Sequence, residues 1–147
     1  MPRHSDPTSL EITGFGDAVR LALALDGALG AAIAAAACDH SGRALYAELA
    51  EVDASVSGGL GRSLALDDVL ERVRACAIAD PRVASVLLVS GGHRSVDIPC
   101  EDDLVVFRHL RRELSGLGVE LVDWVQTDGR TVRSLDLTDG VGGWATS

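Results

Sequence analysis

One short, almost wholly apolar segment constrains this chain more than any other feature. Residues 83–89 read VASVLLV, the length and composition of a strand that is buried on both faces. Such a strand lies inside a sheet with helices on both sides, and the loop at its carboxyl end is where these folds place their chemistry. Here that loop is polar and covers residues 90–99. We therefore expect any functional site at this loop.

Helical patterns lie on both sides of this strand and loop. Residues 67–79 are predicted to form a helix that stops at Asp80 and Pro81, and a second helix is predicted to open at Cys100 and to close at Gly116 and Gly118. Apolar residues recur at three and four positions in both. The two stripes are Val69, Leu70, Val73, Cys76 and Ala77, and Leu104, Phe107, Leu110, Leu114 and Leu117. Cys76 belongs to its stripe, which favours a core thiol over a metal ligand.

The first third of the chain allows two interpretations. Asp17 is predicted to cap a helix that Gly27 and Gly30 weaken and end. Residues 31–38 are mostly alanine and have helix propensity. However, the turn cluster at 39–43 and the alternating residues 44–49 favour a hairpin of two strands. One long alanine helix is the competing interpretation. Residues 51–62 are predicted to be a glycine-rich connection without the Gly-Lys-Ser/Thr ending of a phosphate loop.

The last third predicts a strand at 119–126, a turn at 127–130 and a final strand at 131–135. The full order is then helix, two strands, helix, strand, helix, two strands. This order predicts an α/β (α+β) fold with a single mixed β-sheet flanked by helices. Residues 14–137 form one predicted domain, after a loose arm at 1–13 and before a glycine-rich tail at 138–147.

Composition excludes several classes of function. The 147 residues carry a formal charge of −9, which repels phosphate backbones and anionic lipid surfaces, so neither nucleic acid nor membrane is an expected partner. No apolar run is long enough to span a bilayer, and no secretory signal is read. Three cysteines without Cys-x-x-Cys spacing predict reduced thiols in the cytoplasm. The basic cluster at 108–112, with Arg108, His109, Arg111 and Arg112, is interpreted as a solvated helix face.

The order of elements and the wording of residues 64–135 resemble the JAB/MPN metalloprotease-like fold, in its RadC-like branch. That family follows a buried strand with His-x-His-Pro, then Ser-x-x-Asp at a helix start, then a Leu-Gly-x-x-Leu-x-Asp-His strand and a last strand ending in serine. Three segments of this chain are similar to these motifs. They are Cys100-Glu101-Asp102-Asp103, Leu117-Gly118-Val119-Glu120-Leu121-Val122-Asp123-Trp124 and Arg133-Ser134-Leu135.

The resemblance implies a zinc site whose ligand types this chain has lost. Placed without gaps, the two histidine ligands fall on Ser90 and Gly92 and the aspartate ligand falls on Asp103. The family holds zinc with two imidazoles and a carboxylate, leaving one position open for water. Cys100 replaces the motif's serine, and Glu48 or Glu51 stands near the place of the general base. A lone Asp103 is not expected to retain a metal, so the expected cofactor is none.

Three hypotheses follow. The preferred one is a non-catalytic JAB/MPN-like module that has lost its zinc ligands and acts in association with a protein partner or as a homo-oligomer. The alternative is a divergent hydrolase, in which Cys100 and His93, with acids such as Asp97 and Asp103, rebuild a cysteine- or zinc-dependent site in the 90–103 loop. A third is an unrelated small α/β domain, such as a profilin-like one, that works through dimerisation. A strand at 31–38 lying beside 83–89 would favour the JAB-like assignment over the third.

Overall fold

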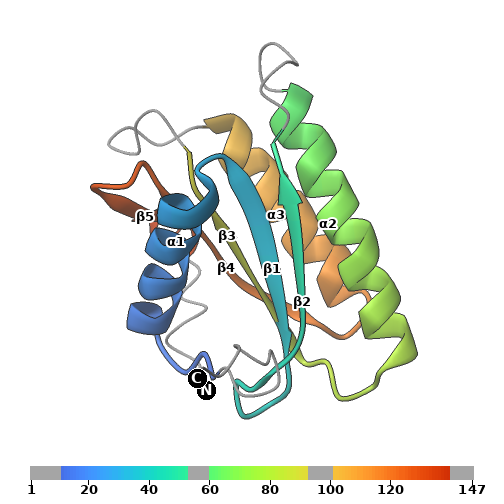
Figure 1. Ribbon diagram of the computed structural model, residues 1–147. Helices are drawn as coiled ribbons and strands as arrows, with labels where there is room; N and C mark the ends of the chain where they lie inside the picture. Colours follow the sequence, from blue (N-terminus) through green and yellow to red (C-terminus); the bar gives the residue numbers. More distant parts are fainter. Residues whose placement is uncertain (1–10, 53–59, 93–100, 140–147) are drawn as a thin grey trace.

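The computed structural model of the chain describes residues 11–52, 60–92 and 101–139 (Figure 1). Side chains are described in all of these except residues 60–62, 101 and 139. The elements are α1 (Phe15–Leu29), β1 (Ala32–Cys38), β2 (Ala44–Glu51), α2 (Leu60–Ala79), β3 (Ser85–Ser90), α3 (Glu101–Ser115), β4 (Glu120–Thr127), β5 (Val132–Ser134) and α4 (Leu135–Asp139). Except for α4, this is the order predicted from the sequence.

The strands form one mixed sheet in the order β2-β1-β3-β4-β5. Only β3 and β4 run parallel, and every other neighbouring pair is antiparallel. Figure 1 shows α1 on one face of the sheet and α2 with α3 on the other. The predicted fold class, a single mixed sheet flanked by helices, is therefore confirmed.

The alanine-rich segment is a strand, as the hairpin interpretation predicted. Gly30, with φ +70°, ends α1 just before it. The Asp39 carboxylate accepts hydrogen bonds from the backbone N–H groups of Ser41 and Arg43, which closes the turn into β2. β1 also lies between β2 and β3 and pairs with both. These backbone partners on both sides outweigh the helix propensity of alanine.

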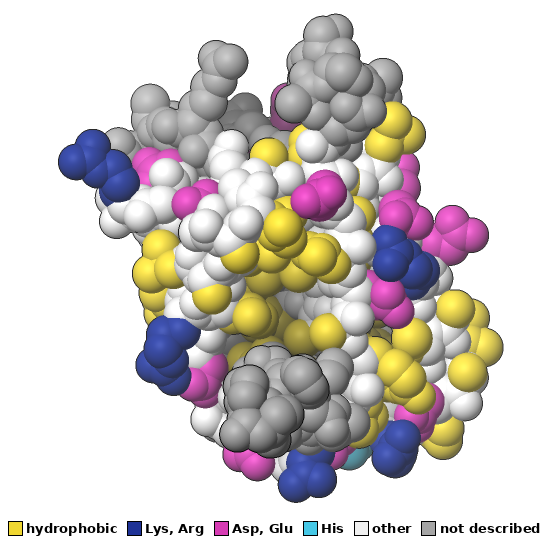
Figure 2. Space-filling model, viewed as in Figure 1, with side chains coloured by type: hydrophobic (Ala, Val, Ile, Leu, Met, Phe, Trp, Pro, Cys, Tyr) yellow, Lys and Arg dark blue, Asp and Glu magenta, His cyan; other side chains and the backbone are white. Residues whose placement is uncertain are grey.

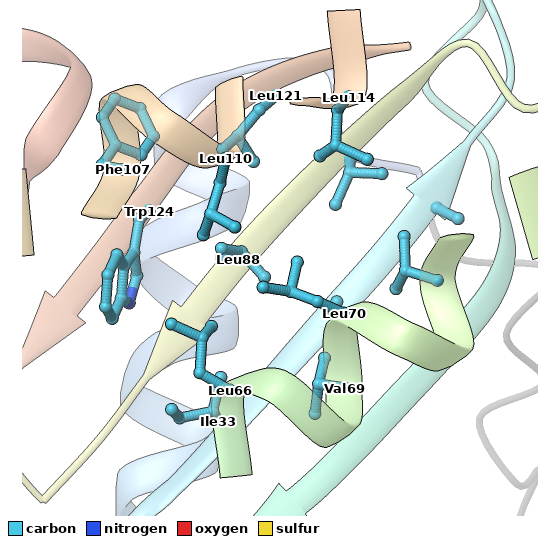
Figure 3. Packing of buried hydrophobic residues seen from close by; sticks show 14 of the residues in the cluster. Ile33, Leu66, Val69, Leu70, Leu88, Phe107, Leu110, Leu114, Leu121 and Trp124 are labelled. Atoms are coloured by element: carbon cyan, nitrogen blue, oxygen red, sulfur yellow. The ribbon is translucent and has the colours of Figure 1, made fainter. Parts of the chain in front are cut away.

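The larger core lies between the sheet and the helices α2 and α3. Trp124 and Phe107 are its largest fully buried side chains. Figure 3 shows leucines of α2 and α3 pointing at side chains from β3 and β4. The opposite cluster, beneath α1, uses smaller residues, among them Ala18, Ala22 and Ala36. The sheet thus has one face of large side chains and one of small ones.

Several boundaries differ from the predictions. α2 begins at Leu60 rather than at residue 67. Ala65 and Leu66, which precede the predicted start, already pack in the core as part of the apolar stripe of this helix. Asp17 is not the cap of α1; Gly14 holds that position, and the Asp17 carboxylate accepts a hydrogen bond from the Thr13 N–H. Ile12, within the arm expected to be loose, is buried in the α1-side cluster.

Two further differences concern the C-terminal half. The last strand ends at Ser134 and the chain turns into α4, because the Asp123 carboxylate accepts the Asp136 N–H and holds that turn. Leu117, counted in the stripe of the preceding helix, lies beyond the end of α3 and is exposed. Among the described residues, no helix has the length and apolar character needed to cross a bilayer.

Candidate functional site

Ser90 is the last residue of β3 and marks the carboxyl end of the central strand, where the sequence predicts the site. Its side chain is buried, and its Oγ accepts a hydrogen bond of 2.9 Å from the Trp124 indole Nε1. A buried indole N–H needs such a partner, because leaving it unpaired costs the full desolvation of the group. The residue at the first implied ligand position therefore serves the packing of Trp124.

Gly92, at the second implied ligand position, has no room for a side chain. Its φ is +75°, and a Cβ built there would lie 2.4 Å from the Ala31 Cα. Its N–H donates a hydrogen bond of 2.7 Å to the Asp26 carboxylate. The backbone here is packed against the start of β1 and tied to α1. An imidazole at this position would require the segment to move.

Asp103, at the third implied ligand position, is buried near the start of α3. Its Oδ2 accepts a hydrogen bond of 2.8 Å from Gln126 Nε2, and the Arg133 guanidinium lies 4.0 Å away. Gln126 Oε1 in turn accepts hydrogen bonds from Nε and Nη2 of Arg133. A buried carboxylate needs a nearby cation and hydrogen-bond donors. Here β4 and β5 supply them from within the chain.

The three positions therefore hold a polar core in place of open ligands. Ser90 accepts a hydrogen bond from the Trp124 indole, and the Gly92 N–H donates one to Asp26. Asp103 accepts a hydrogen bond from Gln126 and lies beside the Arg133 guanidinium. Among the described residues, no group of three His, Cys, Asp or Glu side chains is arranged to hold a metal ion. Gln126 Nε2 and the Arg133 guanidinium, the described nitrogen groups beside Asp103, carry protons and so do not serve as metal ligands.

The two glutamates considered as general bases do not join this cluster. Strand pairing aligns Ser90 with Ile33 and Ile33 with Ala50, so these three residues share a face of the sheet. Glu51 is the next residue after Ala50 and points to the opposite face. Glu48 shares the face of Ser90, but it lies two strands away, and its Oε2 pairs with Arg72 Nη1 at 3.1 Å. Neither glutamate is placed to activate a water beside Ser90.

His93, Asp97 and Cys100 lie outside the described residues, so their predicted roles stay predictions. The two other cysteines are free thiols. Burial raises the pKa of the Cys38 thiol to about 11, and burial also raises the pKa of Cys76. Neither of these thiols is a thiolate nucleophile at neutral pH. Cys76 is only half-buried and does not belong to the core cluster, whereas its neighbour Ala77 packs against that cluster.

A second polar cluster lies beside the first and was not foreseen. The buried Asp123 carboxylate accepts hydrogen bonds from Ser134 Oγ at 2.6 Å and from the backbone N–H of Trp124 at 2.7 Å. Arg111 pairs with buried Asp136 at 2.8 Å and donates to the carbonyl oxygens of Leu121 and Val122. Arg111 thus turns inward, over the Phe107 ring, instead of lying on a solvated face as predicted. Arg108, His109 and Arg112 are exposed, as expected.

A depression of about 380 Å³ opens at the far end of the sheet from Ser90. It lies between the start of β3 and the end of α3, and its lining consists of Ala84, Arg111, Ser115, Gly118, Val119, Glu120 and Leu121. The Arg111 guanidinium there is already engaged with carbonyl oxygens and Asp136. Because its arginine already has these partners, we assign this depression no catalytic or binding role.

The comparisons with known proteins give no family. No family model matches the chain, and no curated protein matches it significantly.

Proposed function

We propose that this chain is a JAB/MPN-like domain of the RadC type that has lost its zinc and acts by binding another protein. The observation that carries the proposal is the use of the three implied ligand positions. Each is committed to an internal contact: Ser90 to Trp124, Gly92 to Asp26, and Asp103 to Gln126 with Arg133. Of the three positions, only Asp103 carries a strong metal-ligand group, and Gly92 has no side-chain ligand atom.

The strand arrangement supports the JAB-like assignment. β1 lies directly beside β3, with Ile33 opposite Ser90, and this placement favours the JAB-like reading over the profilin-like one. The parallel β3–β4 pair brings the start of α3 to the same edge of the sheet as Ser90. In this assignment Arg133 replaces the metal as the positive charge beside Asp103. The fold is kept while its reaction centre has become part of the core.

The loss of the family's histidine ligands at Ser90 and Gly92 supports association as the proposed activity, with no cofactor. The net charge of −9 disfavours nucleic acid and anionic lipid as partners, which leaves protein surfaces. The proposed location is the cytoplasm, which the three cysteines without Cys-x-x-Cys spacing support.

The proposal is tested by the zinc content of the full chain, purified without chelator from cells grown with added zinc. We expect far less than one zinc per chain, and no change in that content when Asp103→Ala is introduced. Elemental analysis and native mass spectrometry provide the measurement. One zinc per chain in the wild-type protein, lost in Asp103→Ala, would overturn the proposal and favour the divergent hydrolase.

A further inference from the structure

The two faces of the sheet are covered unequally. On one face α2 lies over β1 and β2 while α3 lies over β4. On the other face α1 lies over β3 and β4 and meets β1 only at its margin. One face therefore carries two helices and the other carries one within the described part of the chain. The area left beside α1 is the α1-side surface of β2 and the adjoining part of β1, except near the 39–43 turn, where Ile12 belongs to the same cluster as the buried Ala36.

This area, here called the open face, is apolar. Strand pairing places Ala34 opposite Leu49 and Ala36 opposite Ala47, so these four residues share one side of the sheet. Ala34 and Ala36 belong to the α1-side cluster, which fixes that side as the one that α1 occupies. Leu49 is 41% exposed, and Ala47 is exposed as well. Figure 2 shows hydrophobic side chains gathered between α1 and β2, where the surface is hollowed.

The dimensions of the open face fit a helix. Neighbouring strands are about 4.8 Å apart, so the middle of β1–β2 lies roughly 10 Å from the middle of β3–β4, where α1 sits. Packed helices are separated by about 8–10 Å. A helix centred over β1 and β2 would thus lie in contact with α1 along its side. Small residues such as Ala34 and Ala47 allow its side chains to approach the sheet closely.

The free edge of β2 is protected against the addition of a strand. Arg72 reaches from α2 and donates a hydrogen bond of 3.2 Å to the Leu49 carbonyl oxygen. The same guanidinium pairs with the Glu48 carboxylate, which stands on this edge strand. Charged side chains and occupied backbone groups are the usual devices that block edge pairing. A partner is therefore more readily accepted on the open face than along the edge, and a second copy would bring its own Glu48 against this one.

The charge around the open face is negative at one end. Glu51 pairs with Ala32 and so shares the side of Leu49, where it is exposed. The last turn of α1 carries no basic residue, and the C-terminal dipole of this helix is itself negative. Lysine or arginine on a partner would be attracted to this end.

We propose that the open face binds an amphipathic helix of a partner protein, with leucine-like side chains toward the sheet and basic residues toward Glu51 and the C-terminal end of α1. This inference rests on the proposed association function and names the surface and the partner chemistry. The helix would take the position beside α1 that corresponds to the position of α2 on the other face. It would bury Leu49 and Ala47, and its basic groups would offset part of the negative charge at the end of α1.

The test uses the full chain and a fluorescent synthetic peptide of about 15 residues, the length at which isolated helices begin to form. The peptide places leucine at helical spacing on one face and lysine on the other. We expect saturable binding by fluorescence anisotropy, weakened about tenfold by Leu49→Lys and weakened further by adding Glu51→Lys. The matched control is Ile78→Lys, because Ile78 is 73% exposed on α2, and it should leave binding unchanged.

Variants of the peptide and of the protein distinguish a partner helix from the other possible occupants of the open face. A scrambled peptide of the same composition, and one with glutamate in place of lysine, should bind at least about tenfold more weakly. Equal binding of these peptides, equal binding by Leu49→Lys, or no binding by wild type would overturn the inference. So would sedimentation showing a wild-type dimer that Leu49→Lys separates, which assigns the face to a second copy. Binding that arises only when residues 1–10 or 140–147 are deleted would assign it to the chain itself.

Failure here is distinguishable from failure of the proposed function. A zinc-free chain that does not bind the peptide would overturn this inference, but it would leave the proposal of association through another surface standing. A chain with stoichiometric zinc would overturn the proposed function, whatever the peptide does.

Discussion

The face of the sheet that α2 and α3 cover differs from the face that α1 covers in the size of its side chains and in how fully they are shielded. The first is built from leucines, Phe107 and Trp124 and is closed by two helices. The second is built largely from alanines, and Leu49 and Ala47 stay exposed on it. Most of the stability of the fold is therefore expected on the first face, which leaves the second available for a partner.

The implied ligand positions belong to the stable side of this comparison. Ser90 and Trp124 are joined within the larger core, and Asp103 lies at its edge with Gln126 and Arg133. Their side chains are held by the packing of the sheet, so they are not free to adapt to a ligand. Under the proposed function, these positions are part of the interior and binding is assigned to the surface.

The largest effect should come from removing Trp124. Trp124→Ala deletes the largest buried side chain and the indole bond to Ser90, and should lower the free energy of unfolding by about 3–5 kcal/mol. Leu49→Ala on the open face should cost less than about 1 kcal/mol, because Leu49 is already 41% exposed. Urea unfolding followed by circular dichroism measures both. Equal losses would break the comparison between the faces.

A double-mutant cycle tests whether Arg133 balances the charge of Asp103. Asp103→Asn and Arg133→Met should each cost about 3 kcal/mol, because each leaves a buried partner without its counter-charge. The double variant should cost less than the sum, with a coupling of about 1–3 kcal/mol. Additive losses would show that Arg133 does not balance Asp103.

Alanine substitutions at two glycines with similar φ distinguish the cost of backbone strain from the cost of steric crowding. Gly92 and Gly118 have φ of +75° and +78°, but only at Gly92 would a Cβ meet another atom within 4 Å. Gly118→Ala should cost about 1–2 kcal/mol from the backbone alone. Gly92→Ala should cost about 1–3 kcal/mol more because of the contact with Ala31. Thermal unfolding of the two variants gives the difference, and equal losses would mean that position 92 has room for a side chain.

The smallest effect concerns pH. Hydrogen bonds from Arg82 and Tyr46 hold the pKa of Asp80 well below its usual value. A lowered pKa in the folded state stabilises the fold above the unfolded-state pKa of about 3.9, and this contribution is lost as the pH falls toward the folded-state pKa. Asp80→Asn should therefore destabilise the protein slightly at pH 7 and progressively less in acid. A loss that does not shrink below pH 4 would contradict this cause.

Local patterns were sufficient to predict most elements. The turn at 39–43 correctly decided between strand and helix for the alanine run, because turn residues fix the chain direction locally. The start of α2 and the existence of α4 were missed, since tertiary contacts set both. Glu51 was considered as a base because sequence distance says nothing about faces until the register of β2 is known.

Only part of the candidate site could be predicted from the sequence. The loss of histidine at Ser90 and Gly92 is visible in the sequence, and so is the survival of Asp103. What satisfies Asp103 is not visible, because Gln126 and Arg133 come from strands 23 and more residues away. The inward turn of Arg111 was hidden for the same reason, since its partner Asp136 lies 25 residues further along. Long-range pairs of this kind need the sheet order before they can be proposed.

The proposal that the chain holds no zinc is tested most directly by the free energy of unfolding measured with excess zinc and with excess chelator. A metal that binds only the folded chain must stabilise it, and a chelator must remove that stabilisation. We predict the same free energy of unfolding in both conditions, for wild type and for Asp103→Ala alike. Stabilisation by zinc that Asp103→Ala abolishes would contradict the account.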